Sequence, residues 1–396
     1  MNLSNKTYIP LKPGTSSDLV TETTSCLIQL MDILDGLNLT PDSVIKQTIF
    51  LRAEDNDDFN HRHHLVSSKL MEFYDTLLPP TSIVGQPPED PHQCVMELIL
   101  MNRHSTELPL IRKSIEDITY TVVQYPDTKE VYAGGLTSAC DVNNTLACSR
   151  KSFDLMEKVL TTENLTYGDV VRQWNYIEGI VDRQSVGNDV LQNYQIFNDV
   201  RSEYYSKARF DKGYPAATGI GMNAGGIILE FIAVEPKANV HIIPIHNPKQ
   251  IDAHRYSDEV LVGKSVDGLS NKTSPKFERA KYLAIGSMDQ IFLSGTAAIR
   301  GQESSTTQDV RGQTVITIEN MQALISDLNL SNHGIQSQKV TLNVSYLRAY
   351  AKVEKDIDAV RDVCESFFPG VPALYLIADI CRDDLLVELE GIAEWR

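Results

Sequence analysis

Short runs of apolar residues recur in the same order three times along this chain. The segments Pro80–Glu97, Pro215–Glu230 and Pro372–Glu388 each begin with a proline, continue into a short apolar strand, and end in a second apolar strand that carries a glutamate. The proline and the glutamate are 17, 15 and 16 residues apart. Such a repeat indicates one supersecondary module used three times, whose copies bury their apolar sheet faces against one another. Clefts between neighbouring modules are then candidate sites.

The same periodicity predicts an α+β order of elements within each repeat. In the last repeat we expect a hairpin, a helix, a strand, a second helix and two closing strands, beginning near residues 281, 309, 340, 354 and 372. The middle repeat follows this order, and the first has lost most of its opening hairpin. We therefore expect modules at 1–105, 106–236 and 281–396, with a long connector at 237–280.

Composition limits the classes of function. The chain has 396 residues, of which 42% are hydrophobic and 22% charged, as in globular proteins. A net charge of −17 argues against a nucleic-acid partner, and no apolar run approaches the ~20 residues of a membrane span. The six cysteines include no CxxC pair of the metal-binding type, and the first ten residues lack an apolar signal core. We expect a cytoplasmic protein with free thiols.

The order of elements resembles the RidA/YjgF family. The residues that carry the resemblance lie in the third repeat, at 292–296, Asp309, Asn320, 372–373 and 387–393. The resemblance implies an α+β fold of three tandem modules, the first degenerate, in a pseudo-trimeric arrangement with sheets inward and helices outward. It also implies a monomer with a pseudo-trimeric core or a small homo-oligomer.

One departure from the RidA pattern bears on activity. Members of that family that deaminate imines carry an arginine directly after the Pro-Ala pair, where this chain has Leu374, Ala217 and Ser82 in its three repeats. Without that guanidinium to hold a substrate carboxylate, ordinary imine deamination is disfavoured.

A narrower resemblance covers about the last 270 residues. Six segments look like chorismatase sequence and occur in the same order, at 170–177, 193–201, 215–221, 247–250, 274–280 and 373–388. Chorismatases are fused RidA-like modules that cleave the enolpyruvyl ether of chorismate and release pyruvate. The resemblance implies this activity for a small anionic substrate, with no metal and no organic cofactor.

Glu388 is the candidate general acid. It lies between Val387 and Leu389 near the end of an apolar strand, where burial would raise the pKa of its carboxyl enough to hold a proton at neutral pH. Such a proton could be delivered to the enol carbon of a vinyl ether. The alternative is a structural glutamate hydrogen-bonded across a module interface, because Glu97 and Glu230 stand at matching places in the other repeats.

Cationic and aromatic residues complete the candidate site. Arg201 and Arg172 lie among apolar neighbours and are candidate clamps for carboxylates, although a salt bridge to an acidic residue is the alternative for each. Tyr194 could donate a hydrogen bond to substrate or be a plain core tyrosine. Trp174 and Tyr176 share one face of a strand and are expected to shape the pocket wall.

Cys381 and Gly219 bear on the product. The chorismatase resemblance implies that a cysteine and a glycine at these places go with the branch that makes 3-hydroxybenzoate, whereas the branch that gives a cyclohexadiene diol carries bulkier residues. The alternative for Cys381 is a small buried hydrophobe. Histidines at 61, 63 and 64 and in the connector are not expected to bind metal.

Two other functions stay open at this point. One is a RidA-like enamine or imine deaminase that takes its guanidinium from elsewhere in the chain. The other is a non-catalytic module that binds small aromatic acids, in which Glu388 is only structural.

Overall fold

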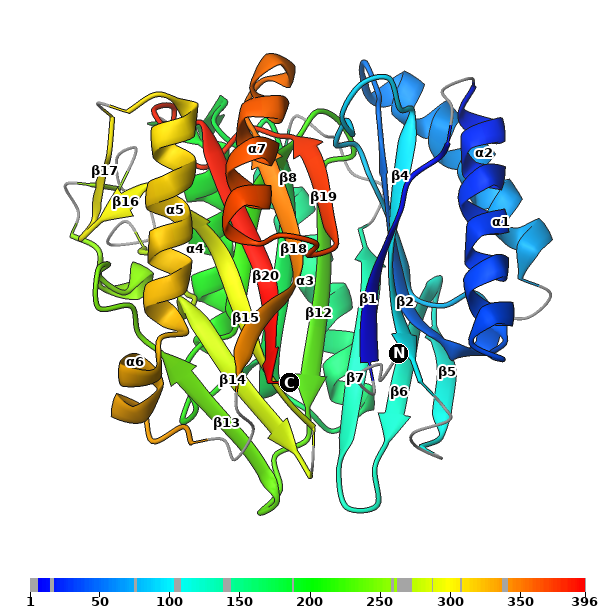
Figure 1. Ribbon diagram of the computed structural model, residues 1–396, viewed down its shortest axis with the longest axis horizontal. Helices are drawn as coiled ribbons and strands as arrows, with labels where there is room; N and C mark the ends of the chain where they lie inside the picture. The colour runs from blue at the N-terminus through cyan, green and yellow to red at the C-terminus, as the bar shows by residue number, and fades with distance from the viewer. Residues whose placement is uncertain are drawn as a thin grey trace.

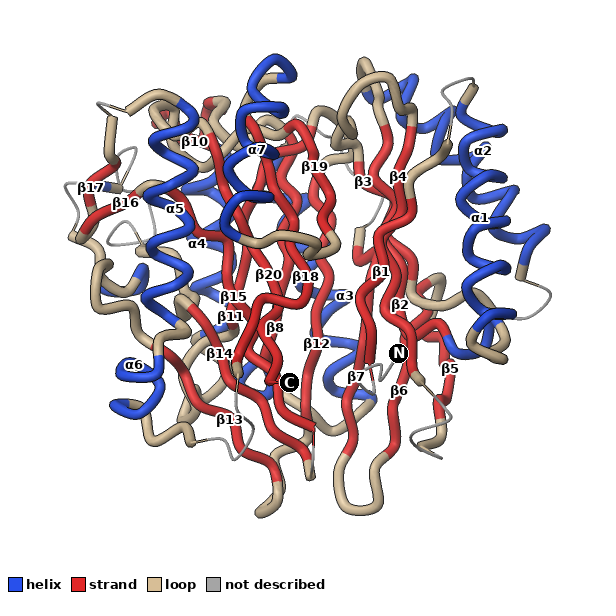
Figure 2. Tube along the Cα trace, in the orientation of Figure 1, coloured by secondary structure: helices blue, strands red, loops and turns tan. Residues whose placement is uncertain are grey.

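The computed structural model describes residues 6–14, 18–74, 77–102, 108–137, 144–186, 189–257, 260–261, 273–286, 288–306, 308–336 and 341–395. Strands from three sheets occupy the interior and helices lie on the outside, as Figure 1 and Figure 2 show. This is the α+β arrangement that the sequence predicts. Within the described ranges, no helix combines the length and the apolar character that crossing a bilayer requires.

The first module has a four-stranded sheet in the order β1-β4-β2-β3 and two covering helices. Its elements are β1 (Lys6–Leu11), α1 (Leu19–Gly36), β2 (Val44–Leu51), α2 (Asn56–Phe73), β3 (Thr81–Val84) and β4 (Cys94–Met101). The side chain of Asp18 begins α1 by accepting hydrogen bonds from the backbone N–H groups of Val20 and Thr21, both at 3.0 Å. The opening hairpin is reduced to β1, as expected for the degenerate repeat.

The second module has a six-stranded sheet in the order β11-β8-β12-β7-β6-β5. Its elements are β5 (Leu110–Ile115), β6 (Ile118–Gln124), β7 (Lys129–Leu136), α3 (Thr145–Thr162), β8 (Val170–Glu178), β9 (Arg183–Val186), β10 (Asp189–Gln192), α4 (Asn193–Tyr205), β11 (Ala216–Met222) and β12 (Ile227–Val234). Helix α4 begins at Asn193, because the residues directly before it pair as the β9–β10 hairpin.

The third module has a six-stranded sheet in the order β13-β14-β15-β20-β18-β19. Its elements are β13 (Val240–Ile245), β14 (Ala280–Ile285), β15 (Met288–Ala297), β16 (Ile299–Arg300), β17 (Glu303–Ser304), α5 (Val310–Leu324), α6 (Asp327–Asn332), β18 (Leu342–Ala351), α7 (Ile357–Phe367), β19 (Ala373–Ile377) and β20 (Val387–Trp395). Strand β13 lies inside the segment expected to be a connector, and it pairs with β14 at the edge of the sheet, where Pro244 is tolerated.

The thiols differ from expectation at one place. Cys148 on α3 is disulfide-bonded, whereas Cys26, Cys94, Cys364 and Cys381 are free.

Strand register corrects the alignment of the repeats. In each module the last strand pairs with the strand before the second helix, and a bulge marks the same point in all three ladders. We count along each ladder from the first residue pair after the bulge. Two positions further on, the last strand carries Glu97 in the first module, Glu230 in the second and Glu390 in the third. The true counterpart of Glu97 and Glu230 is therefore Glu390, and Glu388 corresponds to the apolar residues Val95 and Ile228.

The three equivalent glutamates, which we call the glutamate ring, lie where the modules meet. All three are at most 3% exposed. Each is bonded to a cation from another module, and the pairs are Glu230 with Lys46 at 2.7 Å, Glu390 with Arg172, and Glu97 with Arg348 at 2.6 Å. The pairs run in one direction around the ring, so every module supplies one carboxylate and one cation. Apolar side chains from all three modules pack around it as a common core.

The ring predicts a specific pattern of stability. Lys46→Met should lower the free energy of unfolding by about 3–5 kcal/mol, because it leaves the buried Glu230 carboxylate without its cation. Adding Glu230→Leu should restore part of the loss, since the double variant buries no unpaired charge. Urea unfolding of both variants measures the difference. A double variant that is as unstable as the sum of the single variants would contradict this account.

Candidate active site

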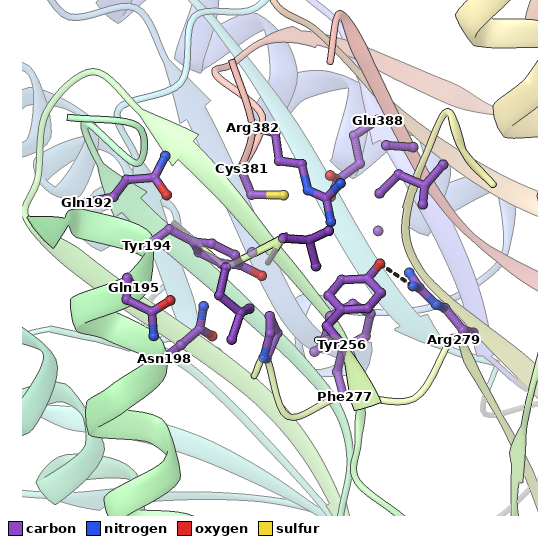
Figure 3. Close-up of a pocket in the computed structure, with 18 residues that line it drawn as sticks. Gln192, Tyr194, Gln195, Asn198, Tyr256, Phe277, Arg279, Cys381, Arg382 and Glu388 are labelled. Atoms are coloured by element: carbon purple, nitrogen blue, oxygen red, sulfur yellow. Dashed lines mark hydrogen bonds between the residues drawn. The ribbon is translucent and has the colours of Figure 1, made fainter. Parts of the chain in front are cut away.

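A hollow lies between the second and third modules. Its volume is about 710 Å³, including the part that is open to solvent. The lining residues are Gln192, Tyr194, Gln195, Asn198, Ala217, Gly219, Tyr256, Val260, Leu261, Pro275, Phe277, Arg279, Gly295, Ala297, Ile299, Cys381, Arg382 and Glu388. They come from α4 and β11 on one side and from β15, β20 and the segment before β14 on the other (Figure 3). The hollow thus lies in one of the clefts between neighbouring modules that the repeat makes candidate sites.

Glu388 projects into this hollow from β20. Its side chain is 5% exposed, and its carboxyl has no hydrogen bond or ion pair with any residue that the structure describes. Burial raises the pKa of Glu388 to about 8, the neighbouring Glu390 charge adds to the rise, and Arg172 and Arg279 oppose it. The carboxyl therefore holds a proton at neutral pH and has no structural partner among the described residues.

A bulge in β15 brings backbone close to this carboxyl. Ser294 and Gly295 together stand opposite the single residue Glu390 of β20. A Cβ on Gly295 would lie only 2.1 Å from Oε1 of Glu388, so only a glycine leaves room for the carboxyl. The Gly295 N–H donates to Thr218 Oγ1 at 3.0 Å, which ties the bulge to the second module.

Two arginines that were not selected from the sequence line the hollow. Arg279 donates from Nη2 to Ile251 O at 2.7 Å and to the hydroxyl of Tyr256, a bond drawn in Figure 3. Arg382 donates from Nη1 to Gln302 O at 2.9 Å. Both guanidinium groups lie against the Tyr256 ring, at 5.5 and 5.4 Å from its centroid. Arg279 and Arg382 thus place two positive charges on the wall of the hollow that the third module forms.

Three residues expected at the pocket do not line it. Arg172 donates to Glu390 and, at 2.8 Å, to Thr218 Oγ1, while Trp174 Nε1 donates to Glu390 Oε1 at 3.0 Å. The Tyr176 hydroxyl donates to Glu230 at 3.4 Å. Residues two apart on a strand share a face, and this face of β8 points to the glutamate ring. The salt-bridge alternative is the arrangement found for Arg172.

The other predicted residues are at or beside the hollow. Tyr194, Gly219 and Cys381 line it, and a Cβ on Gly219 would lie 2.9 Å from Cε2 of Tyr194. Arg201 does not line the hollow itself, but its guanidinium donates a hydrogen bond to Asn198, which does. Burial raises the pKa of Cys381 to about 12, with Glu388 as the second cause, so this side chain is a neutral thiol.

The connector histidines are not among the residues that line the hollow. His246 Nδ1 is 2.9 Å from Asp252 Oδ1 and 4.0 Å from Glu278 Oε2. The Asp252 carboxylate, through its hydrogen bond, raises the pKa of His246. This is an ion pair of the connector, and it was not foreseen because irregular chain does not fix the separation of its residues.

Parts of the chain are similar in sequence to known proteins, and its fold is similar to a solved structure. Residues 111–233 match the model of the N-terminal domain of FkbO/Hyg5-like chorismatases. A 3-hydroxybenzoate synthase of Streptomyces hygroscopicus is 35% identical over 237 residues, which are 58% of this chain and 65% of that protein. A chorismatase of the same species is 34% identical over 233 residues, 58% of this chain and 63% of that protein. A chorismatase crystal structure superimposes with a TM-score of 0.70 at 24% identity and covers 100% of both chains.

The fold and the hollow define a protein of three fused α+β modules with a buried acid at one module interface. Its second module matches the model of the N-terminal chorismatase domain, and 58% of the chain is similar in sequence to curated chorismatases. The matched region spans just under two thirds of the length of these curated relatives.

The raised pKa of Glu388 predicts how stability depends on pH. Between the ordinary pKa of 4.5 and the folded-state value of about 8, the unfolded chain has lost the Glu388 proton while the folded protein keeps it. Rising pH therefore costs the wild type stability in this window, at up to about 1.4 kcal/mol per pH unit, whereas Glu388→Gln does not titrate. In urea unfolding from pH 4 to 9, the free energy of unfolding of the variant should rise relative to that of the wild type. This difference should stop growing above pH 8–9. A constant difference would contradict the assignment.

Proposed function

We propose that this protein cleaves the enolpyruvyl ether of chorismate and releases pyruvate, with 3-hydroxybenzoate as the second product. The observation that carries the proposal is the buried, protonated Glu388 carboxyl, which has no partner among the described residues and lies in a hollow that also presents Arg279 and Arg382. Sequence similarity to a 3-hydroxybenzoate synthase and to a chorismatase supports it.

Chorismate suits the charges of the hollow. It carries two carboxylates, one on the ring and one on the enolpyruvyl arm, and the two lining guanidinium groups can each bind one of them. Asn198, backed by Arg201, and the Tyr194 hydroxyl add hydrogen-bonding groups on the side of the second module. Arg201 then acts through Asn198 rather than by contact, which refines the clamp predicted from sequence.

Proton transfer from Glu388 begins the reaction. The proton adds to the terminal methylene carbon of the vinyl ether, and the electron deficiency moves to the carbon that bears the ether oxygen. The enolpyruvyl arm becomes an oxocarbenium ion, and the Glu388 carboxylate left behind stabilises it. The raised pKa is what makes this proton available at neutral pH.

The nucleophile that meets the cation decides the second product. Attack by the ring's own 4-hydroxyl forms a C–O bond to the cationic carbon and releases the hydroxyl proton. The C4–O bond and the ether bond to the former enolpyruvyl carbon then break and the C3 proton is lost, one proton returning to Glu388 and one going to the phenol oxygen. The products are 3-hydroxybenzoate and pyruvate, whose atoms together equal those of chorismate. Attack by water consumes one water and gives a dihydroxycyclohexadiene carboxylate and pyruvate. Gly219 and the neutral Cys381 thiol leave this part of the wall small, which favours the internal hydroxyl over an ordered water.

Glu388→Gln tests the acid. Pyruvate release from chorismate, followed by coupling to lactate dehydrogenase, should fall by about 10²–10⁴-fold in kcat with little change in KM, since the amide keeps the shape but not the proton. Glu72→Gln, at an exposed position on α2 of the first module, is the control and should keep wild-type activity. Chorismate binding with no turnover by the wild type would favour a non-catalytic binding module. Turnover of amino-acid-derived imines alone would favour a deaminase.

Gly219→Ala tests the choice of product. The added methyl group would meet the Tyr194 ring at 2.9 Å, so the ring must move into the hollow. We expect the ratio of 3-hydroxybenzoate to diol to fall severalfold while pyruvate is still released, as measured by chromatography of the products. Gly14→Ala, where an added Cβ meets nothing within 4 Å, should leave the ratio unchanged. An unaltered ratio in the Gly219 variant would remove this residue from product control.

A further inference from the structure

Two glutamates stand side by side at the interface that carries the hollow. Glu388 and Glu390 are two residues apart on β20 and therefore share one face of the strand. The other two modules have only the second of these, because Val95 and Ile228 occupy the place of Glu388. The third module has thus added a carboxyl next to a member of the glutamate ring.

Glu390 is held as an anion. Arg348 Nη1 lies 2.8 Å from its Oε1, Arg172 bonds to its Oε2, and Thr218, Trp174 and Tyr350 donate hydrogen bonds to it. Burial alone would raise the pKa of Glu390, but the Arg348 and Arg172 charges and the bonds from Thr218 and Trp174 hold it below its ordinary value. Its negative charge is a fixed feature of the interface.

Charges from several elements face Glu388. Arg172 on β8 and Arg279 before β14 favour its ionised form, and Glu390 on its own strand opposes it. Arg382, Tyr194 and Cys381 also line the hollow around it. The balance depends on Arg172, whose Nε and Nη1 have no hydrogen-bond partner among the described residues while its Nη2 is committed to Glu390. A released Arg172 would have donors available for the Glu388 carboxylate.

We propose that Glu390 is a positioning residue that keeps Glu388 protonated, both by its own negative charge and by holding Arg172 away from the Glu388 carboxyl. The inference rests on the proposed function, in which Glu388 delivers a proton. It gives the glutamate ring a second role at one of its three members: structural cohesion at Glu97 and Glu230, and cohesion together with control of an acid at Glu390.

Glu390→Gln is the direct test, with Glu97→Gln as matched control. Infrared difference titration of the protein without substrate follows the protonated carboxyl band that Glu388→Gln abolishes. In wild type the band should titrate near pH 8. In Glu390→Gln the midpoint should fall below about 6, so that at pH 7 the protonated fraction drops from about nine-tenths to a tenth or less. Glu97→Gln removes an equally buried ring glutamate and should leave the midpoint in place.

Activity gives the second readout. In Glu390→Gln the rate of pyruvate release should fall about tenfold at pH 7 and recover towards wild type near pH 5, with KM little changed. Arg172→Met, which removes the cation and keeps Glu390, should move the infrared midpoint upwards, and this opposite shift tests the proposal if the Gln variant does not fold. The proposal is overturned by an unmoved midpoint in Glu390→Gln, by an equal shift in Glu97→Gln, or by a downward shift in Arg172→Met. A shifted infrared midpoint in a protein that never cleaves chorismate would uphold the electrostatic coupling and refute the proposed reaction.

Discussion

The glutamate ring is the constraint on which the rest of the structure depends. Three carboxylates are buried where three modules meet, and an unpaired buried carboxylate would be too costly to keep. Each is bonded to a cation that another module supplies, as in Lys46 with Glu230, and Glu390 has Arg348 of its own module as a second cation. A charged hydrogen bond is directional, whereas apolar contacts still form when two surfaces slide past each other. The three ion pairs therefore restrict the relative orientation of the modules more than the surrounding apolar contacts do.

The same constraint prepares the chemistry at one interface. A carboxyl placed beside a locked anion and out of water keeps its proton, and Glu388 is in that position beside Glu390. The neighbouring glutamates differ in their partners rather than in their burial: Glu390 is surrounded by donors, and Glu388 has none among the described residues. Burial alone does not distinguish an ionised structural carboxylate from a carboxyl that keeps its proton. The two glutamates differ because the cations that bond to Glu390 do not bond to Glu388.

The sequence predicts much of this and fails at identifiable places. Apolar periodicity is enough to predict three α+β modules with candidate sites in the clefts between them, and the position of Glu388 in an apolar strand is enough to predict a raised pKa. Equating Glu388 with Glu230 was wrong by two residues, because the chain between the proline and the last strand differs in length among the repeats: the equivalent glutamates lie 17, 15 and 18 residues after their prolines. The aligned strand sequences 94–97, 227–230 and 387–390 do contain the signal, since all three end in glutamate.

The arginines show the second limit. Arg172 was chosen for its apolar neighbours, yet those neighbours belong to the shared core and the residue pairs with Glu390. Arg279 and Arg382 were passed over although both lie in segments that resemble chorismatases, because they stand outside regular strands, where periodicity gives no direction to a side chain. Tertiary packing of irregular chain places them, with Ile251 O and Gln302 O as the acceptors that hold them.

A comparison of two interfaces within the chain separates packing from chemistry. Between the first and second modules, the Gly135 N–H donates to Ser82 Oγ, and by strand register this bond is the counterpart of the one from Gly295 to Thr218. The close backbone approach is therefore part of how modules join and is not in itself evidence of a site. What the second interface adds is Glu388 in place of the apolar residue found at the first, Ile228. At this interface a carboxyl therefore lies beside a fixed anion and a glycine of the neighbouring strand, and this placement keeps the carboxyl protonated.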